Sequence, residues 1–189
     1  MSMPVILAVL LASAAVAQPG RSELEVSLGG GAWVPTGSDF EGTLSAGPQF
    51  TTGLMIPMFH GDCITLRTGF RSAGADSSAW DGVSCIPLEL GYRAYPLFRR
   101  YAGPRGLEPF VGGMAGGFLA WDSPADGDVE SASSGGFMLS AELGARIRLG
   151  EAAFLEVTVC PEWMPAGKEL AGEDDLSGLT VGAALSFLP

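Results

Sequence analysis

The side chains of this 189-residue chain whose types and spacing could do chemistry are glutamates and arginines set at every second position. Glu142, Arg146 and Arg148 stand in this phase among the aliphatic residues of segment 139–149. Two carboxylates of such a set, for example those of Glu142 and Glu156, could serve as a general acid and a general base. Arginines in the same phase keep carboxylates ionised, so we expect charge pairing rather than acid–base catalysis.

Other catalytic and binding chemistry finds little support in the sequence. His60 is the only histidine, and it forms no visible triad with a serine or cysteine. Cys63, Cys85 and Cys160 match no zinc or redox spacing, and we expect them to pack as small side chains in strands. The net charge of −11 has the wrong sign for nucleic acid. We therefore expect a protein that is not an enzyme and that binds no cofactor and no nucleic acid.

A period of two, the mark of β-strands, recurs along the chain and explains how the charges are positioned. It places aliphatic residues on one face of each strand and polar residues on the other. Most of the strand lengths approach the 9–11 tilted residues that cross a hydrocarbon core. The register of the fifth segment stays open, because that segment has no clear polar face. The segments are 24–34, 48–58, 63–71, 83–95, 107–121, 136–149, 154–163 and 179–187.

The beginning of the chain has the features of an export signal. Residues 4–17 are apolar and uncharged, and Ala15-Val16-Ala17 fits the small-x-small pattern of a cleavage site. We expect a cleaved signal peptide over 1–17 and a single β-barrel domain over 18–189. The mean hydropathy is +0.30, yet no later stretch is long and apolar enough for a membrane helix. This combination favours either a buried all-β core or a membrane barrel whose apolar half faces lipid.

The connections between the predicted strands alternate in length. Long connections cover 35–47, 72–82, 122–135 and 164–178, whereas 59–62 and 150–153 are tight turns and 96–106 is intermediate. Long loops at one rim and short turns at the other are typical of membrane barrels, with both chain ends on the periplasmic side. The four long connections hold 12 of the 21 acidic residues and one base, Lys168. We therefore expect acidic extracellular loops.

The charged faces of these strands would line the lumen of the barrel. An eight-stranded barrel is just wide enough for side chains to fill, and buried charges must pair. We expect an Arg–Glu network that acts as a polar plug, with a gated water or proton path as the alternative. Its members are Glu25, Arg67, Arg71, Glu89, Arg93, Glu142, Arg146, Arg148 and Glu156, with Glu162 on the same face of its strand.

Aromatic residues gather at both ends of the predicted strands. We expect Trp33, Trp80, Trp121 and Trp163 to form a girdle next to the long loops. Aromatic rings favour the two interfaces of a membrane because they combine an apolar body with a polar edge. A second girdle would lie near the short turns. Its predicted members are Phe59, Tyr95, Phe98, Tyr101 and Phe154.

Two acidic clusters in the long loops are candidate metal sites. Asp126, Asp128 and Glu130 resemble a calcium loop but lack the full EF-hand spacing, and residues 173–175 form a second cluster. We expect both to be solvated loops. The alternative is that their carboxylates bind divalent cations shared with lipopolysaccharide.

Three segments resemble the porin-like outer-membrane β-barrel family, which includes small barrels related to outer-membrane proteins A and W. Segment 85–92 (CIPLELGY) is similar to the "Ile-Pro-Leu … Tyr" strand of that family, and segment 108–117 (EPFVGGMAGG) to its "Pro-Tyr-Val-Gly" strand. Segment 143–149 (LGARIRL) resembles the next strand. The resemblance implies an eight-stranded barrel and roles that include adhesion, envelope integrity and passage of small molecules. It implies no shared catalytic residue.

The sequence thus predicts an all-β, eight-stranded antiparallel up-and-down transmembrane barrel in the outer membrane of a Gram-negative cell. We expect a monomer with a structural or interaction role, in contact with outer-membrane lipid and lipopolysaccharide. The first alternative is a narrow pore or carrier for small solutes. The second is a soluble, lipocalin-like barrel that turns its leucines inward, since alternation defines two faces without naming their solvents. A lipid-modifying enzyme is disfavoured by the missing histidine–serine pair.

Overall fold

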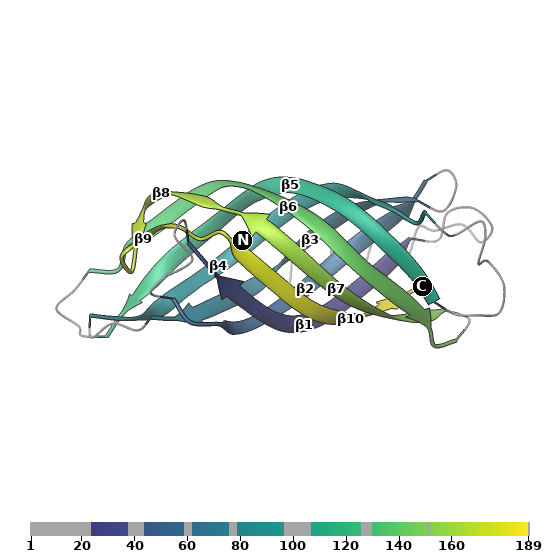
Figure 1. Ribbon diagram of the computed structural model, residues 1–189, viewed down its shortest axis with the longest axis horizontal. Helices are drawn as coiled ribbons and strands as arrows, with labels where there is room; N and C mark the ends of the chain where they lie inside the picture. The colour runs from purple at the N-terminus through teal and green to yellow at the C-terminus, as the bar shows by residue number, and fades with distance from the viewer. Residues whose placement is uncertain are drawn as a thin grey trace.

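The chain forms a closed antiparallel β-barrel, as a computed structural model of the protein shows (Figure 1). The structure describes residues 24–37, 44–58, 62–75, 79–96, 107–125, 130–150 and 152–188, so the expected signal peptide lies outside the described residues. Among the described residues, the barrel has eight strands in the order β1-β10-β7-β6-β5-β4-β3-β2. Their bounds are β1 (Glu25–Pro35), β2 (Gly47–Pro57), β3 (Cys63–Gly74), β4 (Trp80–Ala94), β5 (Leu107–Pro124), β6 (Ser133–Arg148), β7 (Ala153–Trp163) and β10 (Gly178–Phe187).

The alternation of the sequence becomes the two faces of the barrel wall. On β6, Glu142 points into the barrel with 2% of its surface exposed, whereas the neighbouring Leu143 points outward and is 59% exposed. The same order holds around the barrel: the buried charged side chains face inward, and most leucines and valines of the wall, together with Phe50, Phe70, Phe137 and Phe187, face outward. This arrangement is the reverse of the one a soluble, lipocalin-like barrel requires. Among the described residues, no helix is long and apolar enough to span a membrane.

Hydrogen-bonded pairing between strands sets the register that the sequence left open for β5. Leu88 pairs with Gly117 across the β4–β5 ladder, and Phe110 pairs with Gly144 across the β5–β6 ladder. Phe110, Met114 and Phe118 therefore face the lumen. β4, β5 and β6 have 15, 18 and 16 residues, whereas β1, β2 and β7 have 11 each. One side of the wall thus extends further at the end with the long connections.

The predicted long connection over 164–178 joins β7 to β10, and it contains a hairpin that the sequence did not predict. β8 (Pro165–Leu170) and β9 (Glu173–Asp175) form a separate two-stranded sheet at the long-connection end of the barrel (Figure 1). Ala171 and Gly172 make the turn between them, with φ values of 51° and 91°. Two successive positive φ values are typical of the two-residue turns that match the twist of a hairpin. The apolar residues at this turn, Leu170 and Ala171, are buried in the barrel end.

Two of the connections at the opposite end of the barrel are short. The Met58 amide donates to the carbonyl of Asp62 at 2.7 Å between β2 and β3. The Leu149 amide donates to the carbonyl of Ala153 at 2.9 Å between β6 and β7. Val26 at the start of β1 pairs with Phe187 at the end of β10, so the first and last strands meet at this same end.

The barrel lumen as candidate functional site

Ion pairs fill the middle of the lumen, and three strands supply them. Arg67 on β3 lies opposite Glu89 on β4, and Arg67 Nη2 is 2.8 Å from Glu89 Oε2. Ser140 on β6 donates its hydroxyl to the other oxygen of Glu89 at 2.6 Å. Arg67 Nη1 also lies 3.6 Å from Glu142 Oε1. Both oxygens of the buried Glu89 carboxylate are therefore bonded, which offsets the cost of taking that charge out of water.

A second pair lies nearer to the long connections. Arg71 on β3 forms an ion pair across the lumen with Glu162 on β7. Thr180 on β10 donates its hydroxyl to Glu162 Oε1 at 3.3 Å. The Arg71 guanidinium also lies 5.4 Å from the centre of the Trp33 ring, within the range of a cation–π contact. This pair lies between the charged middle of the lumen and the apolar end of the lumen near the long connections.

Toward the short turns, two arginines stack on aromatic rings while they bind carboxylates. Arg93 on β4 bonds Glu142 through Nη2 and Glu156 through Nη1, each at 2.9 Å. Its guanidinium lies 4.0 Å from the centre of the Phe110 ring. Gly144 makes this possible, because a Cβ there would lie 2.4 Å from the ring of Phe110. Small residues that face large ones let the interior of a narrow barrel fill without voids.

Arg146 on β6 contributes further ion pairs near the short turns. Its Nη1 lies 3.1 Å from Glu25 Oε2 on β1, and its Nε binds Glu108 on β5. The same guanidinium lies 4.4 Å from the Tyr95 ring centre and 4.5 Å from that of Phe154. Glu108 was not predicted, since the register of its strand could not be read from the sequence. Its position directly opposite Arg146 in the β5–β6 ladder is the signal that identifies it.

An apolar cluster fills the end of the lumen beneath the long connections. We call it the upper cluster. Trp33, which is 0% exposed, lies in it together with Cys85 and Phe118 from the barrel wall. The segment around the β8–β9 hairpin supplies its remaining cover. The full set is Trp33, Leu44, Ala73, Val83, Cys85, Phe118, Ala120, Met138, Met164, Leu170, Ala171 and Leu176.

The structure places most residues of the predicted network inside the barrel, where they make the ion pairs described above. Arg148 differs from this expectation. It is exposed at the end of β6, and its Nε donates to the carbonyl of Gly150 at 3.1 Å. The strand reaches the rim at this point, so its inner face no longer points into an enclosed space. Glu162 joins the network through Arg71.

The four tryptophans do not form one girdle. The prediction that Trp33 belongs to an outer girdle was wrong. Trp33 lies inside the barrel, on the face of β1 that also carries Glu25. Trp163 is 52% exposed on the outer face, and Trp121 lies 6.2 Å from the Phe70 ring, which is itself exposed. Trp80 is half-buried against the upper cluster. Near the short turns, Tyr95 and Phe154 are also buried inside, so they belong to no outer girdle; Phe59, Phe98 and Tyr101 lie outside the described residues.

The three cysteines are free and buried, and they lie at three depths of the lumen. Cys85 belongs to the upper cluster. Cys160 accepts a hydrogen bond from Arg67 Nη2 at 3.5 Å, which places it beside the middle ion pairs. Cys63 packs with Met55, Tyr95 and Phe110 near the short turns.

The first candidate metal site is only partly within the residues that the structure describes. Asp126 and Asp128 lie outside the described residues, and Glu130 is exposed. Within the described part of the chain, no group of three or more His, Cys, Asp or Glu side chains could hold a metal ion.

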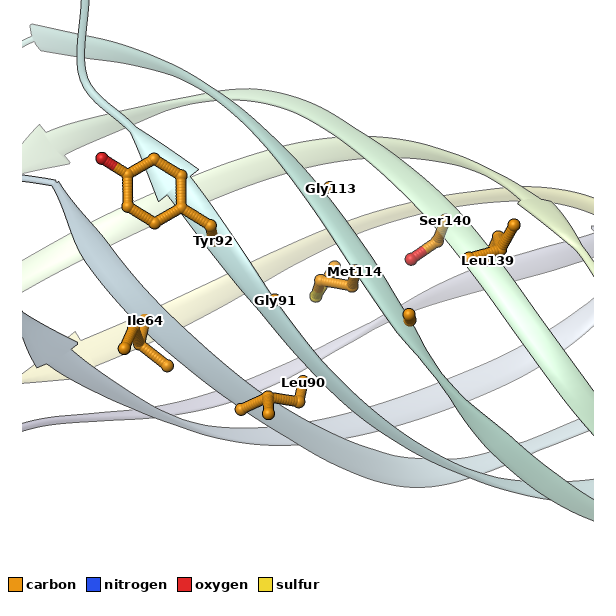
Figure 2. Close-up of a pocket in the computed structure, with 9 residues that line it drawn as sticks. Ile64, Leu90, Gly91, Tyr92, Gly113, Met114, Leu139 and Ser140 are labelled. Atoms are coloured by element: carbon orange, nitrogen blue, oxygen red, sulfur yellow. The ribbon is translucent and has the colours of Figure 1, made fainter.

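The outer wall carries a shallow groove that offers little chemistry (Figure 2). It lies over β3 to β6, where Gly113 and Ala115 leave the surface low between Leu90, Tyr92 and Leu139. Its walls hold no charged side chain, and Ser140 reaches it from the inner face. We therefore regard the groove as part of the apolar outer surface.

No protein-family model and no curated protein matches this sequence. Solved structures share its fold. Neisserial surface protein A is similar with a TM-score of 0.66 and 8% identity over 90% of this chain and 99% of that chain. The outer membrane protein OprG from Pseudomonas aeruginosa gives 0.61 and 15% over 90% and 99% of the two chains. Ail, the attachment invasion locus protein of Yersinia pestis, gives 0.54 and 13% over 89% and 100%. The predicted all-β, eight-stranded barrel fold is confirmed as that of small outer-membrane barrels.

Proposed function

We propose that this chain, which has the fold of small outer-membrane barrels, is an integral outer-membrane protein with a structural or interaction role in the cell envelope. The observation that carries the proposal is the distribution of its side chains. Phe50 and Leu119 are each 65% exposed, and similar residues surround the outer wall. A continuous apolar surface of this kind is costly in water and favourable against acyl chains. The charges are sequestered inside, where they neutralise one another.

The proposal includes an orientation and a set of partners. Residues 1–17 act as a cleaved export signal, and 18–189 form the barrel domain. The short-turn end faces the periplasm, and the acidic long connections face outward. The protein contacts outer-membrane lipid and lipopolysaccharide as a monomer. One solved complex of Ail contains the heparin analogue sucrose octasulfate. The net charge of −11 argues against a heparin-like sulfated partner for the acidic long connections of the present chain, whereas the contact with lipopolysaccharide proposed here is made by the apolar outer wall.

The packed lumen favours a structural or interaction role over a pore. Three layers lie in series between the two ends: the upper cluster, the middle ion pairs, and the arginines stacked on aromatic rings. Moving a solute through them would require breaking buried ion pairs, each of which is costly to open. The absence of catalysis stays a prediction.

Membrane location and conductance can be tested separately. We expect the expressed protein to resist carbonate extraction from outer-membrane fractions and to migrate differently on gels with and without boiling. A protein that carbonate releases, and whose migration boiling does not change, would refute the membrane barrel. In planar lipid bilayers, we expect the reconstituted protein to show no stable openings. Stable openings of uniform conductance would refute the structural role and support a pore instead.

A further inference from the structure

The β8–β9 hairpin covers the lumen without belonging to the barrel wall. It forms its own two-stranded sheet, and it follows β7 and precedes β10 at the long-connection end (Figure 1). Among the described residues, no ladder of paired strands joins it to its neighbour β6. Since the barrel closes through other strands, the hairpin can leave its position without opening the wall.

The hairpin has an apolar side that fits into the barrel and a polar side that faces away. Leu170 at the end of β8 is fully buried in the upper cluster, as is Leu176 directly after β9, and Ala171 in the turn is almost so. Lys168, Glu169 and Asp174 are exposed. A segment that served only to connect two strands would not need a buried tip. The burial indicates that the hairpin acts as a plug in the outward end of the lumen.

Polar contacts hold this plug at defined points. The buried Asp122 carboxylate at the end of β5 accepts from the Ala132 amide at 2.6 Å and from the Ala171 amide at 3.4 Å. It therefore ties the β5–β6 connection to the tip of the hairpin. Ser134 Oγ on β6 accepts from the Lys168 amide at 3.0 Å. Backbone hydrogen bonds hold the base of the segment, where the Leu176 amide donates to the Met164 carbonyl at 3.0 Å. Beyond this base, the hairpin is attached by a few side-chain contacts and by its apolar tip.

The turn itself is strained, and a hairpin that loses its turn conformation as it leaves the barrel relieves that strain. Ala171 has a φ of 51°, in the left-handed region that residues other than glycine, asparagine and aspartate rarely adopt. The contacts of the buried tip must offset this unfavourable backbone conformation. A glycine there would remove the strain, as Gly172 does at the following position.

We infer that the β8–β9 hairpin is a movable plug, latched by the Asp122 carboxylate, that exposes the upper cluster while the barrel stays folded. Opening gives access as far as Trp33 and the Arg71–Glu162 pair. The ion pairs and stacked arginines below keep the lumen closed. A movable plug requires the closed barrel but not its location in a membrane. The inference of a plug can therefore be refuted while the proposed function stands.

The cysteines provide a readout at different depths. One variant keeps only Cys85 (Cys63→Ala, Cys160→Ala), and a second keeps only Cys63 (Cys85→Ala, Cys160→Ala). Each is folded into phospholipid vesicles and treated with a charged maleimide, and labelling is followed over hours. We expect slow labelling of Cys85 and none of Cys63. Asp122→Ala should speed labelling of Cys85 about tenfold, the effect of losing charge-assisted hydrogen bonds, and leave Cys63 unlabelled.

A second substitution keeps the inference testable if Asp122→Ala does not fold. Ala171→Gly removes the strained turn and should slow labelling of Cys85 severalfold while the heat-modifiable migration stays normal. Labelling of Cys85 at equal rates in the parent and in folded Asp122→Ala would overturn the inference. So would parallel labelling of Cys63, because the whole barrel would then be loosening. If Asp122→Ala fails to fold, an unchanged rate in Ala171→Gly refutes the plug on its own.

Discussion

Removal of the Arg93 guanidinium should destabilise the barrel strongly, because it leaves two buried carboxylates without their main counter-charge. Arg93 makes two hydrogen bonds to Glu142 at 2.9 and 3.0 Å and two to Glu156 at 2.9 and 3.0 Å. Both carboxylates are 2% exposed, so in Arg93→Met they stay away from water without their main counter-charge. Breaking a buried ion pair by removing one partner costs about 3–5 kcal/mol.

The triple variant Arg93→Met, Glu142→Gln, Glu156→Gln separates the charge effect from the packing effect. It removes the positive charge and both carboxylate charges together, so no uncompensated charge remains near position 93. Replacement of a complete buried ionic group by groups of similar size is often close to neutral. We therefore expect the triple variant to recover most of the stability that the single variant loses.

The assay is equilibrium unfolding by guanidinium chloride in phospholipid vesicles, followed by tryptophan fluorescence and by the fraction that keeps heat-modifiable migration. Arg148→Met is the matched control, because this arginine is exposed at the rim, where ion pairs contribute at most about 1 kcal/mol. The reasoning is refuted if Arg93→Met costs no more than Arg148→Met. It is equally refuted if the triple variant is less stable than Arg93→Met.

Three further predictions use the same unfolding assay. Leu143→Arg puts a charge on the outer face and should cost about 2–4 kcal/mol in vesicles, and a negligible cost there would contradict the lipid contact. Trp33→Ala should cost about 3–5 kcal/mol because the ring is fully buried, whereas Trp163→Ala on the outer face should cost much less; equal losses would contradict the interior position of Trp33. Gly144→Ala should cost about 1–3 kcal/mol because its Cβ would meet the ring of Phe110 on the neighbouring strand β5, while Gly150→Ala, with open space around it, should change little.

The sequence predicted the faces of the strands because the information for them is local. A period of two assigns each residue of a strand to one face, whatever the rest of the chain does. Glu142 and Leu143 could therefore be assigned to opposite faces from their own neighbours alone. The strand count and the alternation of long and short connections came from equally local signals. The predicted Trp33 girdle failed where a general preference of aromatic rings was given more weight than this alternation.

The tertiary structure decided what depends on residues far apart in the chain. Barrel closure determined that water is excluded from the polar face and that the aliphatic face is outside. It also joined Arg71 to Glu162, which are 91 residues apart, and set the register that brings Glu108 opposite Arg146. The hairpin over 165–175 needed the upper cluster to receive its apolar tip, so no pattern within that segment could predict it. A strand's face is a property of its own sequence, but its partner and its solvent exist only once the barrel has closed.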